Sequence, residues 1–167
     1  MNKKGKVIWF TGLPCSGKTT IAQALIPKIA ELGYSADLLD GDVLRNSNFS
    51  KGAGFSKEER EKHLLRVGFM ASMLSQYSYA ICSFVSPFED VRNEMPIDEL
   101  VYIKCSAEEC ARRDVKGMWA KAKNGEIKGF TGYDAPYEEP KNPALVLDTE
   151  KLTIDQCVDQ IINLLGI

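Results

Sequence analysis

The residues with the clearest chemistry lie near the start of the chain, where residues 12–19 read GLPCSGKT. This segment matches G-x-x-x-x-G-K-[ST], the pattern of a phosphate-binding loop, at every fixed position. The glycines let the backbone turn tightly, so that successive N–H groups point at phosphate oxygens. The lysine can reach the outer phosphates of a nucleoside triphosphate, and the first threonine can hold Mg²⁺ through its hydroxyl. We therefore expect a nucleotide to be bound by Gly12, Leu13, Pro14, Cys15, Ser16, Gly17, Lys18, Thr19 and Thr20.

The flanks of this segment decide between a phosphate loop and a chance glycine-rich turn. A strand-like apolar run precedes it, and apolar residues at helical spacing follow it. Both are the context that a phosphate loop requires.

A second group of candidate residues follows the next apolar run, in Leu39-Asp40-Gly41-Asp42, with Arg45 one helical turn later. In an α/β sheet this order places two carboxylates and a guanidinium at the same edge as the phosphate loop. One carboxylate could deprotonate an acceptor hydroxyl, and Arg45 could bind a phosphate through two hydrogen bonds. A polar turn that caps a strand is the other interpretation, and these residues alone leave both open.

Three more features could belong to a site. Val85-Ser86-Pro87-Phe88 ends an apolar run and suits either an active-site rim or an ordinary turn. Arg60 and His63 are one turn apart on a predicted helix, although a lone histidine is more often a surface or core residue. Residues 112–128 contain six cations and two acids, which fits a solvated helical face or a basic flap that closes over phosphates.

Composition limits the class of protein. The chain has 167 residues, a net charge of −2, 44% hydrophobic and 26% charged residues, as one ordinary globular domain would. This charge gives no reason to expect a nucleic acid as partner. No segment is long enough to span a membrane, and the short stretch before the first strand leaves no room for a signal peptide. We expect a cytoplasmic protein.

The five cysteines show no C-x-x-C spacing and accompany one histidine, so neither zinc nor a disulfide framework is expected. Cys82, Cys105 and Cys157 lie in apolar runs and are predicted to be core residues. Cys15 lies near a predicted helix N-terminus, which could lower the pKa of its thiol.

Alternating strands and helices predict the fold. Capping boxes at Ser56–Glu59, Ser106–Glu109 and Thr153–Gln156 open three helices, and Gly33 ends an earlier one over Thr19–Leu32. Residues 46–54 have the composition of a mobile loop. This order predicts a mostly parallel sheet covered by helices on both faces, with ligands at the carboxyl ends of the strands. The predicted strands are Val7–Thr11, Ala36–Leu39, Tyr79–Val85, Leu100–Cys105 and Leu145–Leu147.

Taken together, these motifs resemble the adenylylsulfate (APS) kinase family, in order and over nearly the whole chain. The segments are GLPCSGKTT, LDGDVLR, GFSKEER, SFVSPF, RRDVKGMWAKAKNGEIKGFTGYDAPYE and PALVLDT, and KGFTG at 128–132 is the most diagnostic. The resemblance implies a single P-loop kinase domain over residues 1–167, with a mobile basic lid at about 112–135. It implies Mg²⁺-dependent transfer of the ATP γ-phosphoryl group to the ribose 3′-hydroxyl of adenosine 5′-phosphosulfate.

The resemblance also implies a role for each matching residue. Lys18 and Asp42 would be catalytic, with Asp42 activating the 3′-hydroxyl, and Arg113 would lie against the ATP adenine. Ser86 matches a serine proposed as a phosphorylated intermediate, which direct in-line transfer does not need. Phe55 and Phe130 would sandwich the acceptor base. The acceptor site would comprise Asp42, Arg45, Phe55, Arg60, His63, Val85, Ser86, Lys116, Gly129 and Phe130.

Departures from the family pattern fall on the acceptor side. His63 and Val43 replace asparagines, Leu65-Arg66 replaces an arginine pair, and the segment after Ser86 is shorter. We expect His63 to face the acceptor's 5′-phosphate beside Arg60 and to alter acceptor choice. A related nucleotide such as cytidine diphosphoramidate is therefore the rival acceptor, and a non-catalytic nucleotide switch is a third hypothesis. A homodimer is left open.

Overall fold

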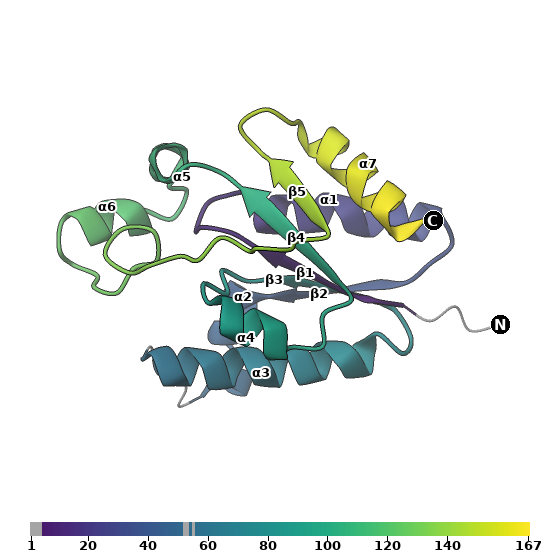
Figure 1. Cartoon of the computed structure of the whole chain (residues 1–167), viewed down its shortest axis with the longest axis horizontal. Coiled ribbons are helices and arrows are strands. Elements are labelled where there is room, and N and C mark those ends of the chain that lie inside the picture. The colour runs from purple at the N-terminus through teal and green to yellow at the C-terminus, as the bar shows by residue number, and fades with distance from the viewer. Residues whose placement is uncertain (1–4, 52–53, 55) are drawn as a thin grey trace.

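A computed structural model describes residues 5–51, 54 and 56–167 and shows one five-stranded sheet with helices on both sides (Figure 1). The strand order is β2-β3-β1-β4-β5, and each neighbouring pair is parallel. All five predicted strands are confirmed, and so is the α/β fold. The strands are β1 (Val7–Thr11), β2 (Ala36–Asp40), β3 (Tyr79–Ser83), β4 (Glu99–Lys104) and β5 (Leu145–Asp148).

Strand β3 ends two residues before its predicted end. The last ladder contact past the strand is the bond from Phe84 N–H to the Phe10 carbonyl, 3.2 Å long. Ser86 then takes a positive φ of 39°, which turns the chain away from the sheet. An apolar run alone does not reveal where such a turn begins.

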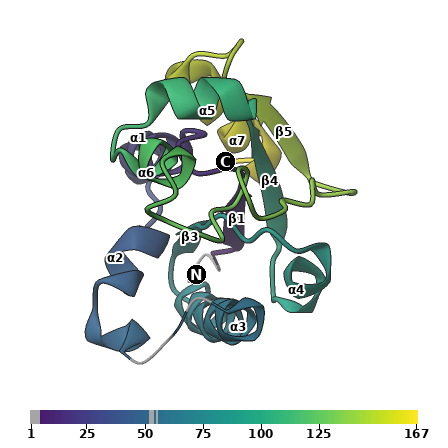
Figure 2. The ribbon, with the colours of Figure 1, turned by 90° about the vertical axis from the view of Figure 1, so that its left-hand side faces the viewer.

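The helices divide between the two faces of the sheet, with α1 and α7 on one side and α3 and α4 on the other (Figure 1). Helices α5 and α6 lie beyond the carboxyl ends of the strands (Figure 2). The helices are α1 (Lys18–Glu31), α2 (Gly41–Arg45), α3 (Lys57–Leu74), α4 (Glu89–Glu94), α5 (Ala107–Arg113), α6 (Met118–Lys123) and α7 (Ile154–Leu165).

The core has two layers because strand side chains alternate between the faces of the sheet. Ile8 and Phe10 pack under α1 and α7, whereas Trp9 packs with Phe84 and with the buried side of α3. Helices therefore cover both faces, which explains why β1 is apolar at every position.

Two of the three predicted capping boxes are confirmed, at Ser56–Glu59 and Thr153–Gln156. Ser106 also caps its helix by accepting a hydrogen bond from the Glu109 N–H. The Glu109 carboxylate does not complete that box, because it binds Arg112 and Arg113 instead.

The stretch predicted as a mobile loop, residues 46–54, contains a short 3-10 helix, η1 (Asn48–Ser50), where the structure describes it. Ser47 caps η1 by accepting a bond from the Phe49 N–H. Among the described residues, no helix is long and apolar enough to cross a membrane.

Candidate active site

The phosphate loop joins β1 to α1 at the carboxyl end of the sheet (Figure 1). Gly17 has a φ of 106°, a conformation that other residues rarely adopt. A Cβ at Gly12 would lie 2.4 Å from the Ile103 carbonyl oxygen, so a side chain would push the loop away from β4. Both glycines of the motif are therefore required by the backbone, as the sequence predicted.

Lys18 fills the loop with its own ammonium group. Its Nζ donates hydrogen bonds to the carbonyl oxygens of Gly12, 2.9 Å away, and Leu13, 2.7 Å away. Burial lowers the pKa of Lys18 to about 8, because a buried ammonium is costly to keep charged. Phosphate oxygens would be better partners for this cation than two neutral carbonyls.

Three side-chain oxygens meet beside the loop. Thr19 Oγ1 donates to Asp40 Oδ2 at 2.7 Å and lies 3.2 Å from Ser83 Oγ. The other Asp40 oxygen caps α2 by accepting the N–H bonds of Asp42 and Val43. These hard oxygens suit Mg²⁺, which commonly takes one or two carboxylates plus substrate phosphates. No cluster of three or more His, Cys, Asp or Glu side chains that could hold a metal ion occurs in the described part of the chain.

The two carboxylates of the LDGD motif have separate places. Asp40 is buried and bonded to Thr19 and to the start of α2, whereas the Asp42 side chain is 66% exposed in the first turn of α2. Asp42 forms an ion pair with Lys116, which lies between α5 and α6. Arg45, one turn on, donates to the Gly54 carbonyl at 3.0 Å. The structure thus brings together Asp42 and Lys116, two predicted acceptor residues that are far apart in the sequence.

The KGFTG segment contacts α3 through Arg60, whose Nη2 donates to the Gly129 carbonyl at 3.0 Å. Phe130 is buried and packs edge-on against Trp119, with ring centres 5.2 Å apart. Asp134 fixes the segment by accepting the N–H bonds of Gly129 and Phe130. The predicted partner of Phe130 in the base sandwich, Phe55, lies outside the described residues.

His63 differs from the sequence-based expectation. It is buried, and its ring packs against Phe49 and Phe84. Burial, with the nearby charges of Arg45 and Arg66, lowers the pKa of His63, so the expected cationic form is disfavoured. The Nε2 atom has no hydrogen-bond partner within the described ranges.

Val85 and Ser86 form a tight turn after β3. The Val85 carbonyl accepts from Thr11 Oγ1 at 2.8 Å, and Ser86 Oγ accepts from Trp9 Nε1 at 3.0 Å. Ser86 is only 2% exposed, so its hydroxyl could not receive a phosphoryl group without the turn opening. This geometry favours direct transfer to an acceptor.

The segment predicted as a lid rests on the phosphate loop. Arg113 Nη1 donates to the Ser16 carbonyl at 3.3 Å and to Thr149 Oγ1 at 3.1 Å. The indole of Trp119 donates to the Pro14 carbonyl at 3.1 Å. Sequence reasoning missed Trp119, although a tryptophan among six cations was a signal that part of this segment is buried.

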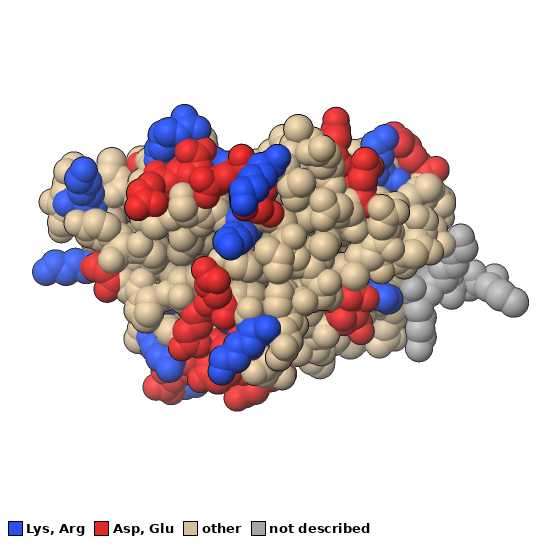
Figure 3. Space-filling model, turned by 45° about the horizontal axis from the view of Figure 1, so that its top comes forward, with Lys and Arg blue, Asp and Glu red and all other residues tan. Residues whose placement is uncertain are grey.

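Several cations of this segment are paired within the chain. The Glu109 carboxylate binds Arg112 at 2.6 Å and Arg113 at 2.9 Å, and these bonds lower the pKa of Glu109 to about 2. Lys116 is paired with Asp42. Figure 3 shows the same interspersion of basic and acidic side chains on the face that it presents. The segment is therefore less basic in effect than its composition indicates.

The expectation for Cys15 is wrong in direction. Although Cys15 precedes α1, burial raises the pKa of its thiol. Cys82, Cys105 and Cys157 are buried as predicted, and Cys110 is buried with them.

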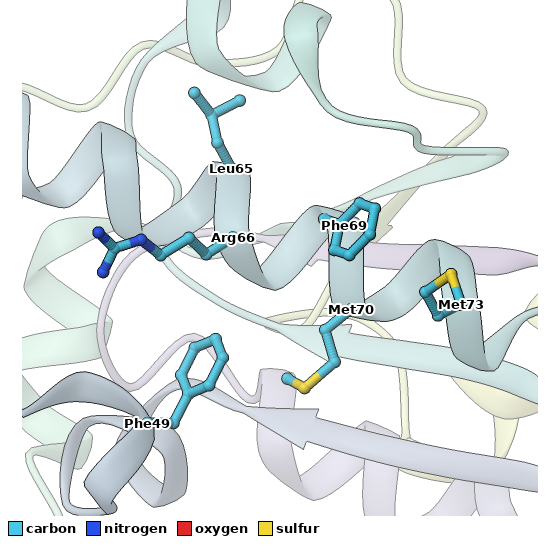
Figure 4. A pocket seen from close by; sticks show the side chains of 6 residues that line it. All are labelled: Phe49, Leu65, Arg66, Phe69, Met70 and Met73. Carbon is cyan, nitrogen blue, oxygen red and sulfur yellow. The ribbon is translucent and has the colours of Figure 1, made fainter.

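An apolar groove lies apart from these residues, along the outer side of α3 (Figure 4). Phe69 and Met73 are 68% and 51% exposed there. The groove contains none of the predicted nucleotide contacts. It is lined by Phe49, Leu65, Arg66, Phe69, Met70 and Met73.

Comparison with known proteins settles the family. The family model described as adenylylsulphate kinase matches residues 4–148. The chain belongs to the adenylylsulfate kinase family. It is therefore a kinase, and the P-loop kinase fold predicted from its motifs is confirmed.

Individual relatives agree with this assignment, and two of the three below are matched over nearly their whole length. A probable adenylyl-sulfate kinase of Aeropyrum pernix is 46% identical, over 97% of this chain and 93% of the relative. The APS kinase of Mycobacterium tuberculosis, solved with AMPPNP and APS, is 38% identical with a TM-score of 0.91, over 98% and 99% of the two chains. A hexameric APS kinase from Thiobacillus denitrificans is 31% identical with a TM-score of 0.66, over 99% of this chain and 29% of the relative.

Proposed function

We propose that this kinase transfers the γ-phosphoryl group of ATP to the ribose 3′-hydroxyl of adenosine 5′-phosphosulfate. The observation that carries the proposal is Asp42, an exposed carboxylate at the phosphate-loop edge of the sheet that pairs with the Lys116 ammonium. The M. tuberculosis relative solved with AMPPNP and APS supports both substrates.

In the proposed reaction the 3′-oxygen forms a bond to the γ-phosphorus as the bond to the β,γ-bridging oxygen breaks. Asp42 takes the proton of the 3′-hydroxyl, which requires that it leave Lys116. Lys18 turns from the loop carbonyls to the β- and γ-phosphates and neutralises charge in the transition state.

The other proposed contacts surround these two residues. Arg113 lies against the adenine of ATP, and the Phe130 ring stacks on the acceptor base together with Phe55. The cationic side chains of Arg45 and Arg60 bind the phosphate and sulfate of the acceptor. His63 does not touch the acceptor in this proposal; it packs behind the site against the Phe84 and Phe49 rings and influences the acceptor through them. The remaining acceptor contacts are Val85, Ser86, Lys116 and Gly129.

Mg²⁺ belongs to the same proposal. Thr19 and Asp40 would hold the ion, with Ser83 beside them, because their oxygens already meet within hydrogen-bond distance. Bound there with ATP, the ion would neutralise phosphate charge. Because it uses ATP, we place the enzyme in the cytoplasm.

The assay for this function compares acceptors with ATP as donor. We expect ADP release that depends on adenosine 5′-phosphosulfate, with a 3′-phosphorylated product detected by mass spectrometry. Turnover with cytidine diphosphoramidate but not with adenosine 5′-phosphosulfate would assign the rival acceptor. Nucleotide binding without transfer to either acceptor would identify a switch.

We further propose that residues 1–167 form one domain whose lid, at about 112–135, moves when substrates bind. Its present contacts with the phosphate loop include the Trp119 bond to Pro14, which ATP entry should disturb. We expect faster amide exchange across the lid in the free enzyme than with ATP analogue and acceptor bound, measured by mass spectrometry. Equal exchange in both states would contradict a moving lid.

We also propose a homodimer that pairs the outer faces of α3. Leu65, Phe69 and Met73 recur every fourth residue and are all exposed. The stripe is symmetric about Phe69, so antiparallel copies would pack Leu65 against Met73, as isologous contacts require. We expect Phe69→Lys to give a monomer by light scattering, whereas Ile154→Lys, a control at another exposed apolar residue, should not. An unchanged mass for Phe69→Lys would rule out this face.

A further inference from the structure

Arg92 of α4 is a buried arginine, 2% exposed, and phosphate binding does not explain its position. Its guanidinium donates to the Ser86 carbonyl at 2.6 Å, to Glu89 Oε2 at 2.5 Å and to the Glu138 carbonyl at 2.7 Å. Burying a cation is costly, and hydrogen bonds offset that cost. Since the Arg92 Nε has no partner among the residues that the structure describes, the three contacts of the two terminal nitrogens define what Arg92 holds in place.

The first contact holds a strained turn. Ser86 has a φ of 39°, a strained conformation for a residue other than glycine. Such a turn persists only where its surroundings fix it, and here Arg92 and Trp9 bond to the carbonyl and hydroxyl of Ser86. The turn belongs to the proposed acceptor site.

The third contact holds the chain where it returns from the lid. Glu138 N–H donates to the Pro87 carbonyl at 2.8 Å, and the Glu138 carboxylate accepts from the Glu89 N–H at 2.7 Å. Residues 137–139 are thus hydrogen-bonded along the segment between Ser86 and α4, and Arg92 bonds to both stretches.

Tyr137 extends the same network to β1. Its hydroxyl lies 2.9 Å from Thr11 Oγ1, which itself donates to the Val85 carbonyl at 2.8 Å. The Arg92 guanidinium lies 5.9 Å from the centre of the Tyr137 ring. One network therefore joins the strand that enters the phosphate loop, the acceptor turn and the C-terminal end of the lid.

We propose that Arg92 is a positioning residue for the acceptor, because it fixes the Ser86 turn against the chain that leaves the lid. This inference rests on the proposed function for its choice of acceptor. The planar guanidinium presents its donors in a fixed fork and reaches three acceptors at once. A lysine ammonium is a compact charge on a flexible stem and does not reproduce that geometry.

The test compares Arg92→Lys with Arg112→Lys. Arg112 is a matched control because it is also paired with a glutamate three residues earlier, but its side chain is 74% exposed. For Arg92→Lys we expect the KM for the acceptor to rise about tenfold or more, with the KM for ATP changed less than about twofold. Arg112→Lys should change neither. Equal changes in both KM values, or a loss of kcat alone, would make Arg92 merely structural.

Amide hydrogen exchange is a second measurement, and it needs no acceptor. In Arg92→Lys, exchange should quicken at residues 84–88 and 137–141 together, while β1 and β4 stay protected. Protection unchanged in either segment would overturn the proposal. If the wild-type enzyme did not phosphorylate adenosine 5′-phosphosulfate, the proposed function would fail and this reading would still decide the role of Arg92. Should Arg92→Lys not fold, Tyr137→Phe, which removes the hydroxyl beside Thr11, should raise the acceptor KM in the same direction.

Discussion

Replacing Lys18 with methionine should lower kcat for phosphoryl transfer by about 10³-fold or more, the largest effect we expect of any single substitution. Methionine keeps the length and volume of the side chain and removes its charge. The β- and γ-phosphates would then lose the cation that the loop holds ready between Gly12 and Leu13. Single-turnover kinetics with saturating ATP measure this loss, and near-normal transfer would remove Lys18 from the mechanism.

The same variant should not be less stable in the absence of nucleotide. Burial lowers the pKa of Lys18 to about 8, from the value near 10.5 of an exposed lysine, so the charged form is destabilising in the folded protein. This cost to the free energy of folding is fully present below pH 8. It disappears as the pH rises from about 8 to about 10.5, because in that range Lys18 is more protonated in the unfolded chain than in the folded protein. The stability gained by Lys18→Met should therefore shrink over that range in urea denaturation curves.

Asp42→Asn should lower kcat by about 10²-fold or more while both nucleotides still bind. The amide keeps the shape of the side chain and cannot accept the proton of the 3′-hydroxyl. Stability should change by less than about 1 kcal/mol, because the pair with Lys116 is exposed. Asp37→Asn is the control, since Asp37 lies on the same strand as the motif and binds Ser78 instead.

Kinetics and binding must be measured together for Asp42. Isothermal titration with an ATP analogue, and then with the acceptor, reports binding separately from turnover. If acceptor binding failed and each bound complex reacted at the normal rate, Asp42 would hold the substrate and another group would take the proton.

The features that sequence reasoning predicted correctly depend on local chemistry. Apolar runs marked all five strands, and Gly12 and Gly17 marked a loop whose backbone only glycine allows. Ser56 and Thr153 marked two helix starts because a capping box lies within four residues. Each signal is complete within a short stretch of chain.

The features that it missed depend on which segments meet in space. A core position was one of the alternatives for His63, but nothing near it in the sequence shows that Phe49 and Phe84 enclose it. The bond from Arg92 to the Glu138 carbonyl joins residues 46 positions apart, the bond from Trp119 to Pro14 joins residues 105 apart, and the contact of Tyr137 with Thr11 joins residues 126 apart. Side chains of this kind act through tertiary contacts that periodicity does not encode.

The pairing of the lid's cations has a consequence for the speed at which substrates arrive. Arg112, Arg113 and Lys116 face carboxylates of their own chain, and the protein as a whole carries a net charge of −2. Long-range attraction of an anion depends on net charge, whereas paired charges act only over short distances. Nucleotides should therefore meet this enzyme at a rate that varies little with ionic strength, and the positive charges of Arg113 and Lys116 become available only after contact.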